Sequence, residues 1–182
     1  AFAHGLAERA RALRVGDGLA GDTDQGPLIN IAAHAKVTAH VADALAGGAE
    51  VLTGGKSHAA GDIYFEPTVL TDVRSDALLC REETFGPIAG LERVGSDDEA
   101  ISLANASRAG LAAYVYARDF SRAHRFAEAL DFGMVGLNTG LISTEVAPFG
   151  GCKESGIGRE GSHYGLAEFH ELKTVCADIG EP

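Results

Sequence analysis

From Pro87 to Leu137 the sequence alternates short apolar runs with amphipathic segments, and this alternation limits the folds open to the chain. Strands are predicted at 87–94, 111–116 and 134–137, separated by a helix that ends near residue 107 and a helix at 121–130. Ser96 and Glu99 have the Ser-x-x-Glu spacing of a capping box, which predicts the start of the first helix. This order is typical of right-handed βαβ units, so we predict an α/β fold with an open, twisted, mainly parallel sheet and flanking helices.

The two ends of the chain carry weaker patterns. Helices are predicted over 1–14 and 30–46, and short strands at 50–53 and 68–70. From Thr139 to Gly165 no clear periodicity is present, and a loop of this length inside a compact domain is usually functional or disordered. A short helix near 166–172 and a terminal strand at 174–179 complete the prediction.

Charge and hydropathy disfavour two classes of partner. The chain has 182 residues and a formal net charge of -11, and an acidic surface repels nucleic-acid phosphates and anionic lipids. No apolar run approaches the roughly 20 residues that span a bilayer, so we expect neither a nucleic-acid nor a membrane partner. The N-terminal residues lack an initiator Met and a signal-peptide pattern and resemble the middle of a helix, which indicates that sequence is missing in front of them.

The cysteines Cys80, Cys152 and Cys176 have no CxxC spacing, so we expect no disulfide framework and a reducing, cytoplasmic setting. Cys152 lies in a glycine-rich loop beside Lys153, a cation of the kind that lowers a thiol pKa and activates nucleophiles. Because spacing places no His or acidic partner near it, a non-catalytic Cys152 is the favoured interpretation. Cys80 and Cys176 lie in apolar contexts and are expected in the core.

Two other motifs fail on their context. Residues 156–161 fit G-x-G-x-x-G, but that dinucleotide fingerprint follows an apolar strand, and the residues at 150–155 are not one. His34 and His40 fall on different faces of one predicted helix, and the sequence contains no H-E-x-x-H. We therefore predict no metal site and interpret these histidines as surface or core residues.

The strongest functional signal is the segment Glu-Glu-Thr-Phe-Gly-Pro at 82–87, at the entrance to a predicted strand. One interpretation is a ligand-facing corner, in which Glu82 and Glu83 accept hydrogen bonds from sugar hydroxyls and Phe85 offers a flat apolar face. The other is a solvated acidic turn with Phe85 in the core. The residues alone leave both interpretations open.

Residues 82–87 resemble the E-E-x-F-G-P motif of the aldehyde dehydrogenase superfamily, and later segments agree with that family in order and spacing. Asn105 with 110–112 resembles its N-x-x-x-x-G-L-A stretch, 136–138 its G-x-x-N strand, and 148–165 its closing P-F-G-G-x-K-x-S-G-x-G-R-E motif. The resemblance covers essentially the whole chain. Residues 141–151 and 161–165 are most similar to the succinate-semialdehyde dehydrogenase branch.

This resemblance implies an oxidoreductase that uses NAD or NADP and a small aldehyde, with oxidation of succinate semialdehyde to succinate as the expected reaction. In the family a cysteine thiolate attacks the aldehyde to give a thiohemiacetal, and a hydride passes to the nicotinamide. A water activated by a glutamate then hydrolyses the thioester. Backbone and asparagine amide donors stabilise the oxyanion.

The resemblance also implies roles for residues of this chain. Glu83 matches the position that binds the nicotinamide ribose hydroxyls, and Phe85 a position that packs near the nicotinamide. Ser143 matches a position that, in the succinate-semialdehyde branch, helps to hold the substrate carboxylate. Phe149 matches an aromatic residue that lines the aldehyde tunnel.

Other matches concern assembly. Arg159 and Glu171 match positions at or near the subunit interface. Residues 174–179 resemble the terminal strand that pairs with a neighbouring subunit, which implies a homo-oligomer.

The nucleophilic cysteine, the general-base glutamate, the oxyanion asparagine and the dinucleotide-binding domain of the family lie upstream of every matched segment. The resemblance thus implies a C-terminal portion: catalytic-domain sequence over 1–169, an oligomerisation segment over 170–182, and an absent N-terminal dinucleotide-binding domain. No catalytic residue is expected in the chain, which alone is predicted to be inactive. Two alternatives stay open, a stand-alone non-catalytic assembly or binding module and an aldehyde dehydrogenase of other specificity.

Overall fold

The computed structural model describes residues 1–178 and 180, and the chain divides into two compact units between Ser96 and Asp97. None of the helices described here is long and apolar enough to cross a membrane.

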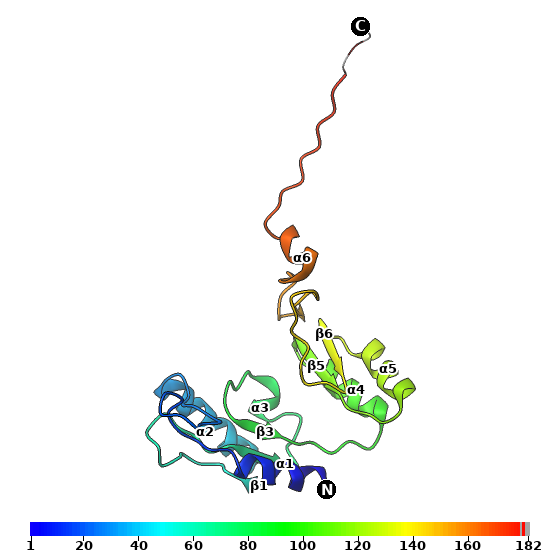
Figure 1. Cartoon of the computed structure of the whole chain (residues 1–182). Helices are drawn as coiled ribbons and strands as arrows, with labels where there is room; N and C mark the ends of the chain where they lie inside the picture. Colours follow the sequence, from blue (N-terminus) through cyan, green and yellow to red (C-terminus); the bar gives the residue numbers. More distant parts are fainter. Residues whose placement is uncertain (179, 181–182) are drawn as a thin grey trace. The chain divides into compact units, whose positions relative to one another are not determined.

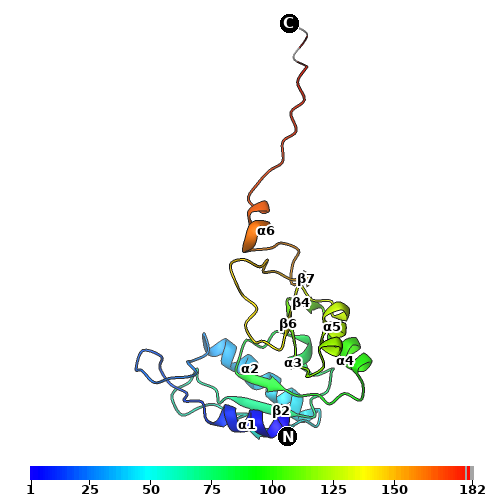
Figure 2. The same ribbon diagram turned by 45° about the vertical axis from the view of Figure 1, so that its right-hand side comes forward.

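The first unit is a small sheet with a helix on each face. Its elements are α1 (Phe2–Arg11), α2 (Ile31–Ala46), β1 (Glu50–Thr53), β2 (Thr68–Thr71), α3 (Leu78–Arg81) and β3 (Ile88–Gly90). The strand order is β1-β2-β3, with β1–β2 antiparallel and β2–β3 parallel. Figures 1 and 2 show α1 and α2 on opposite sides of this sheet. The successive residues Val69 and Leu70 point to opposite faces of β2, and both are buried because both faces are covered.

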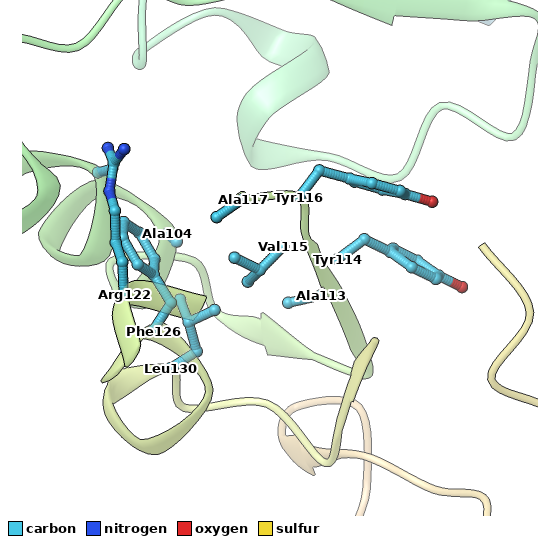
Figure 3. A pocket seen from close by; sticks show the side chains of 10 residues that line it. Ala104, Ala113, Tyr114, Val115, Tyr116, Ala117, Arg122, Phe126 and Leu130 are labelled. Carbon is cyan, nitrogen blue, oxygen red and sulfur yellow. The ribbon is translucent and has the colours of Figure 1, made fainter. Parts of the chain in front are cut away.

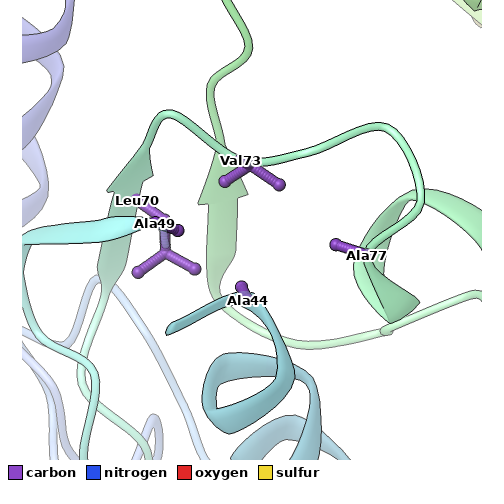
Figure 4. Packing of buried hydrophobic residues seen from close by; sticks show 5 residues of the cluster. All are labelled: Ala44, Ala49, Leu70, Val73 and Ala77. Carbon is purple, nitrogen blue, oxygen red and sulfur yellow. The ribbon is translucent and has the colours of Figure 1, made fainter. Parts of the chain in front are cut away.

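Helix α2 contributes to both parts of the core of this unit. The Asn30 side chain caps it by accepting a hydrogen bond from the backbone N–H of Ala33 at 2.8 Å. One face of α2 packs its side chains into two clusters of buried residues. The first consists of Ala44, Ala49, Leu70, Val73 and Ala77 (Figure 4), and the second of Val37, Val41 and Phe65.

The loop after α1 is closed by an ion pair. Arg14 binds the Asp24 carboxylate through its backbone N–H and Nε, both at 2.9 Å, and through Nη2 at 3.1 Å. These hydrogen bonds from the Arg14 side chain and backbone hold the pKa of Asp24 at about 2 instead of 3.8.

We expect Asp24 to titrate with a midpoint near pH 2 in an NMR titration of its carboxyl carbon. Because the folded-state pKa lies below the unfolded value of 3.8, the contribution of this pair to folding is complete above that value. It is lost as the pH falls through about 2. Arg14→Gln should return the midpoint toward 3.8, and an unchanged midpoint in that variant would contradict the assignment.

The second unit packs two helices on one face of a two-stranded parallel sheet. Its elements are α4 (Asp97–Asn105), β4 (Ala109–Gly110), β5 (Ala112–Val115), α5 (Phe120–Ala129), β6 (Met134–Leu137), β7 (Cys152–Lys153) and α6 (Ser162–Ala167). Strand β5 pairs in parallel with β6, and β4 pairs antiparallel with β7. Arg122 of α5 binds Asp97 of α4, with Nε 2.9 Å from Oδ2, and Arg125 binds Asp98.

A cavity of about 300 Å³ lies between α4, β5 and α5 (Figure 3). Val115 of β5 points toward Phe126 and Leu130 of α5, whereas the rings of Tyr114 and Tyr116 point away from the helices. Tyr114 and Tyr116 are exposed on that opposite face. The alternation of side chains along a strand therefore separates a helix-covered face from a bare one.

The α/β class is confirmed, but one open, mainly parallel sheet is not what the described strands form. They make three small sheets, and only β2–β3 and β5–β6 are parallel. The predicted βαβ order connects β3 to β5 through α4, yet consecutive strands are neighbours in only about two-thirds of cases. The predicted βαβ unit of β5, α5 and β6 is present with its two strands parallel, whereas β3 pairs with β2 and not with β5.

The C-terminal predictions also need correction. The last helix spans Ser162–Ala167 instead of 166–172, because Gly161, at φ 68°, reverses the chain directly before it. No strand is present over 174–178, where every residue is exposed and pairs with no other segment, and residue 179 lies outside the described residues. A strand needs a hydrogen-bonding partner, and the described residues supply none here.

Cys80 and Cys176 are exposed and not in the core. Cys80 lies on the short α3 and Cys176 follows α6, so apolar neighbours in sequence did not produce burial.

Candidate functional site

The segment 82–87 forms a corner between α3 and β3, anchored at both ends. Before it, the backbone N–H of Leu78 donates to Asp43 Oδ2 of α2 at 2.7 Å. After it, the Pro87 carbonyl accepts from the N–H of Thr68 at 2.8 Å, where β3 enters the sheet. The corner is thus placed by a helix and a sheet, which are more rigid supports than another loop.

Two side chains of this corner face outward. Phe85 is 82% exposed and has φ 50°, so the interpretation that buries this ring in the core is wrong. Glu83 is exposed, and none of the described residues donates a hydrogen bond to its carboxylate. A non-glycine residue in the left-handed region costs about 1 kcal/mol or more, a strain that often marks functional loops.

This geometry fits a nicotinamide dinucleotide. A carboxylate is an acceptor only, and a ribose presents hydroxyl donors to it. The exposed Phe85 ring adds an apolar face of the kind that packs against a flat heterocycle. The corner therefore presents two groups that suit the two halves of a nicotinamide riboside.

In the second unit, the long loop from Thr139 follows a residue whose side chain is held by two hydrogen bonds. Asn138, at φ 54°, accepts from the N–H of Ala117 and donates to its carbonyl, both at 2.9 Å. Ile142 lies over β6, since a Cβ added to Gly136 would lie 2.7 Å from its Cγ2. Ser143 follows and is exposed, and its hydroxyl has no partner among the described residues. The loop is fixed close to Ser143, and the hydroxyl itself is available to a ligand.

The closing segment pairs with itself. The backbones of Phe149 and Glu160 exchange two hydrogen bonds of 2.8 Å, which holds the half-buried Phe149 in place. Arg159 Nη1 donates to the carbonyl of Gly151 at 2.7 Å and to that of Gly158 at 2.8 Å. The structure therefore places Phe149 and Arg159 beside one isolated bridge, between Phe149 and Glu160, while Glu171 lies in the exposed segment after α6.

Other motif residues bind the backbone. Asn105 donates to the Ala129 carbonyl at 2.7 Å and accepts from the N–H of Asp131 at 2.9 Å. Lys153 Nζ donates to the Asn105 carbonyl at 2.9 Å, and Cys152 Sγ to the Asp131 carbonyl at 3.1 Å. These side chains join loops. The Cys152 thiol donates to carbonyls, and no basic side chain among the described residues forms a hydrogen bond with it.

The family model for aldehyde dehydrogenases matches residues 1–175. The chain belongs to the aldehyde dehydrogenase family. The glutarate-semialdehyde dehydrogenase of Pseudomonas aeruginosa is 51% identical over 97% of this chain and 36% of its own length. The succinate-semialdehyde dehydrogenase of Escherichia coli, named for NADP(+), is 52% identical over 98% of this chain and 37% of its own length. The mitochondrial succinate-semialdehyde dehydrogenase of Arabidopsis thaliana is 51% identical over 96% of this chain and 33% of its own length.

Solved aldehyde dehydrogenase structures agree with the fold. Succinate-semialdehyde dehydrogenase from Burkholderia pseudomallei has a TM-score of 0.90 at 58% identity and covers 92% of this chain and 35% of that one. Betaine aldehyde dehydrogenase from Staphylococcus aureus, in complex with NAD+, has a TM-score of 0.86 at 37% identity and covers 92% of this chain and 34% of that one.

The chain spans about a third of the length of these aldehyde dehydrogenases. A mitochondrial relative does not fit a strictly cytoplasmic setting, and the cytoplasmic setting of this chain stays a prediction. The roles of Glu83, Phe85, Ser143 and Phe149 also stay predictions.

Sequence reasoning missed the supports of the corner. His40 and Lys36 of α2 contact it, whereas the sequence alone predicts only a surface or core role for His40. A usable signal was present, because His40 falls in the apolar stripe of Val37, Val41 and Ala44, where a polar residue needs a partner.

Proposed function

We propose that the chain is the C-terminal part of an NAD(P)-dependent aldehyde dehydrogenase that oxidises succinate semialdehyde to succinate. The observation that carries this proposal is the outward-facing Glu83 and Phe85 corner, in a chain about half identical to succinate- and glutarate-semialdehyde dehydrogenases. Both of these named substrates carry a carboxylate at the end opposite the aldehyde.

In this proposal the chain binds and orients, and supplies no nucleophile. The Glu83 carboxylate accepts hydrogen bonds from the ribose hydroxyls, and the Phe85 ring packs near the nicotinamide, whose chemistry is to accept the hydride. The Ser143 hydroxyl donates to the substrate carboxylate, and Phe149 lines the path of the aldehyde. The reactive cysteine comes from sequence outside this chain.

Two assays test the proposal. The complete enzyme should reduce NAD or NADP in the presence of succinate semialdehyde, and the 182-residue chain alone should not. Turnover by the isolated chain at an ordinary enzymatic rate would overturn the placement of the nucleophile, and no turnover by the complete enzyme would overturn the substrate.

Assembly forms the last part of the proposal. Arg159, Glu171 and residues 170–182 contribute to contacts between subunits of a homo-oligomer. The exposure of Glu171 and of the described residues after α6 leaves that segment available for pairing.

Ser143→Ala in the complete enzyme should lower kcat/KM for succinate semialdehyde roughly tenfold, because a hydrogen bond to a charged group is worth about 1.5–3 kcal/mol. The value for butanal, an uncharged aldehyde of the same chain length, should change little. Steady-state kinetics on both aldehydes measure the difference. An equal loss on both would remove Ser143 from substrate selection.

A further inference from the structure

Helix α2 holds the corner through one of its faces. Lys36 Nζ donates to the Glu83 carbonyl at 3.0 Å, and His40 Nδ1 lies 3.0 Å from Thr84 Oγ1. Asp43 anchors α3 just before the corner. These three residues recur at helical spacing, so they lie along one side of α2.

His40 is the buried member of this set. It is 1% exposed, and its Nε2 lies 3.5 Å from Glu82 Oε2 while its Nδ1 faces Thr84. Because a carboxylate only accepts, this arrangement favours the proton on Nε2, and Nδ1 then accepts from the Thr84 hydroxyl. One imidazole is thus hydrogen-bonded to Thr84 and lies beside the Glu82 carboxylate, so it contacts the residues on both sides of Glu83.

The side chains of the corner alternate. Those of Glu82 and Thr84 contact His40, and those of Glu83 and Phe85 face outward. The carbonyl of Glu83 is held separately by Lys36. The groups that face away from α2 are therefore the two assigned to the cofactor in the proposed function.

We propose that His40 is a positioning residue for cofactor binding, with Lys36 as a second support. This inference rests on the proposed role of Glu83. A buried imidazole is costly unless its nitrogens are bonded, and a leucine would fill the same position without that cost. The polar contacts of His40 go to the corner, so their effect is on the conformation of residues 82–85.

The variants separate positioning from packing. His40→Leu removes both contacts with the corner, and His40→Asn keeps a polar atom near the place of Nδ1, within reach of Thr84. Thr84→Val removes the hydroxyl from the other side at a half-buried position, where folding is less at risk. Val41→Ala is the packing control, since it lies on the same helix and packs in the cluster with Phe65.

A second control is His34→Asn. His34 lies on α2 as well, but its Nε2 is 2.9 Å from Ser57 Oγ and its ring packs on Phe65, so the interactions of its side chain with described residues lie outside the corner. The His34→Asn variant should change neither the cofactor dissociation constants nor the amide exchange of the corner. The two readouts are calorimetric dissociation constants of the complete enzyme for NAD and NADP, and amide hydrogen exchange of residues 82–86 without cofactor.

We expect His40→Leu and Thr84→Val to weaken cofactor binding about tenfold and to speed exchange at 82–86, with KM for the aldehyde unchanged. His40→Asn should recover part of the loss. Val41→Ala should lower the melting temperature without weakening cofactor binding. Two results would overturn the proposal. The first is that Val41→Ala weakens cofactor binding as much as His40→Leu does when the two variants have the same melting temperature. The second is that amide exchange at 82–86 is unchanged in both His40→Leu and Thr84→Val.

Failure of the proposed function gives a different result. In that case the unmodified enzyme binds neither NAD nor NADP. The exchange measurement still decides whether His40 holds the corner, because it needs no cofactor.

Discussion

Gly133→Ala should lower the free energy of unfolding by about 3 kcal/mol, because overpacking a rigid contact costs that order of energy. A Cβ at this position would lie 2.0 Å from the Gly150 carbonyl oxygen and 2.7 Å from the Gly151 Cα. Both are backbone atoms, and the Gly133 N–H is itself bonded to the Gly110 carbonyl at 2.9 Å. Neither side of the contact can rotate away as a side chain would.

Urea unfolding followed by circular dichroism measures this loss, and Gly158→Ala is its control. At Gly158 the nearest atom to an added Cβ is Glu168 Oε1, the end of a flexible side chain, at 3.4 Å. That variant should lose less than about 1 kcal/mol. Equal losses in the two variants would show that the close approach of Gly133 to Gly150 does not limit stability.

Glu83→Gln should lower kcat/KM for the cofactor roughly ten- to a hundredfold in the complete enzyme. The amide keeps the size of the side chain but loses its charge, and hydrogen bonds to charged groups are worth about 1.5–3 kcal/mol. Kinetics at varied NAD and NADP and saturating aldehyde measure this change.

Glu92→Gln is the matched control, because Glu92 is an exposed carboxylate just after β3 in the same unit. It should leave cofactor kinetics unchanged. If both variants behave like the unmodified enzyme, Glu83 does not bind the ribose.

Local patterns predicted most helices and several strands. Asn30 and the glycine pair after α2 bounded that helix correctly, and the apolar run at 134–137 is β6. The two-residue strands β4 and β7 were not predicted, because two residues carry no periodicity. Their pairing joins Gly110 to Cys152, which only the folded chain brings together.

The candidate site also has a part that local sequence predicts and a part that depends on distant contacts. The corner at 82–87 was found from residue types, whereas its support by His40 depends on a contact between residues far apart in the sequence. The sequence indicates which side chains of one segment can bind a ligand. It does not show which distant side chain holds that segment in place. For Cys80, neighbouring apolar residues suggested burial that the short α3 does not provide.

The two anchors of the corner have a consequence for sequence variation. The Leu78 N–H is bound to Asp43, and the Pro87 carbonyl to Thr68 in the parallel register of β3 on β2. An inserted or deleted residue between these anchors would either displace Glu83 and Phe85 or, if the Pro87 anchor is lost, shift β3 by one position and exchange its two faces. We therefore expect natural variants to carry substitutions at the corner and no gaps, so its length is constrained independently of its chemistry.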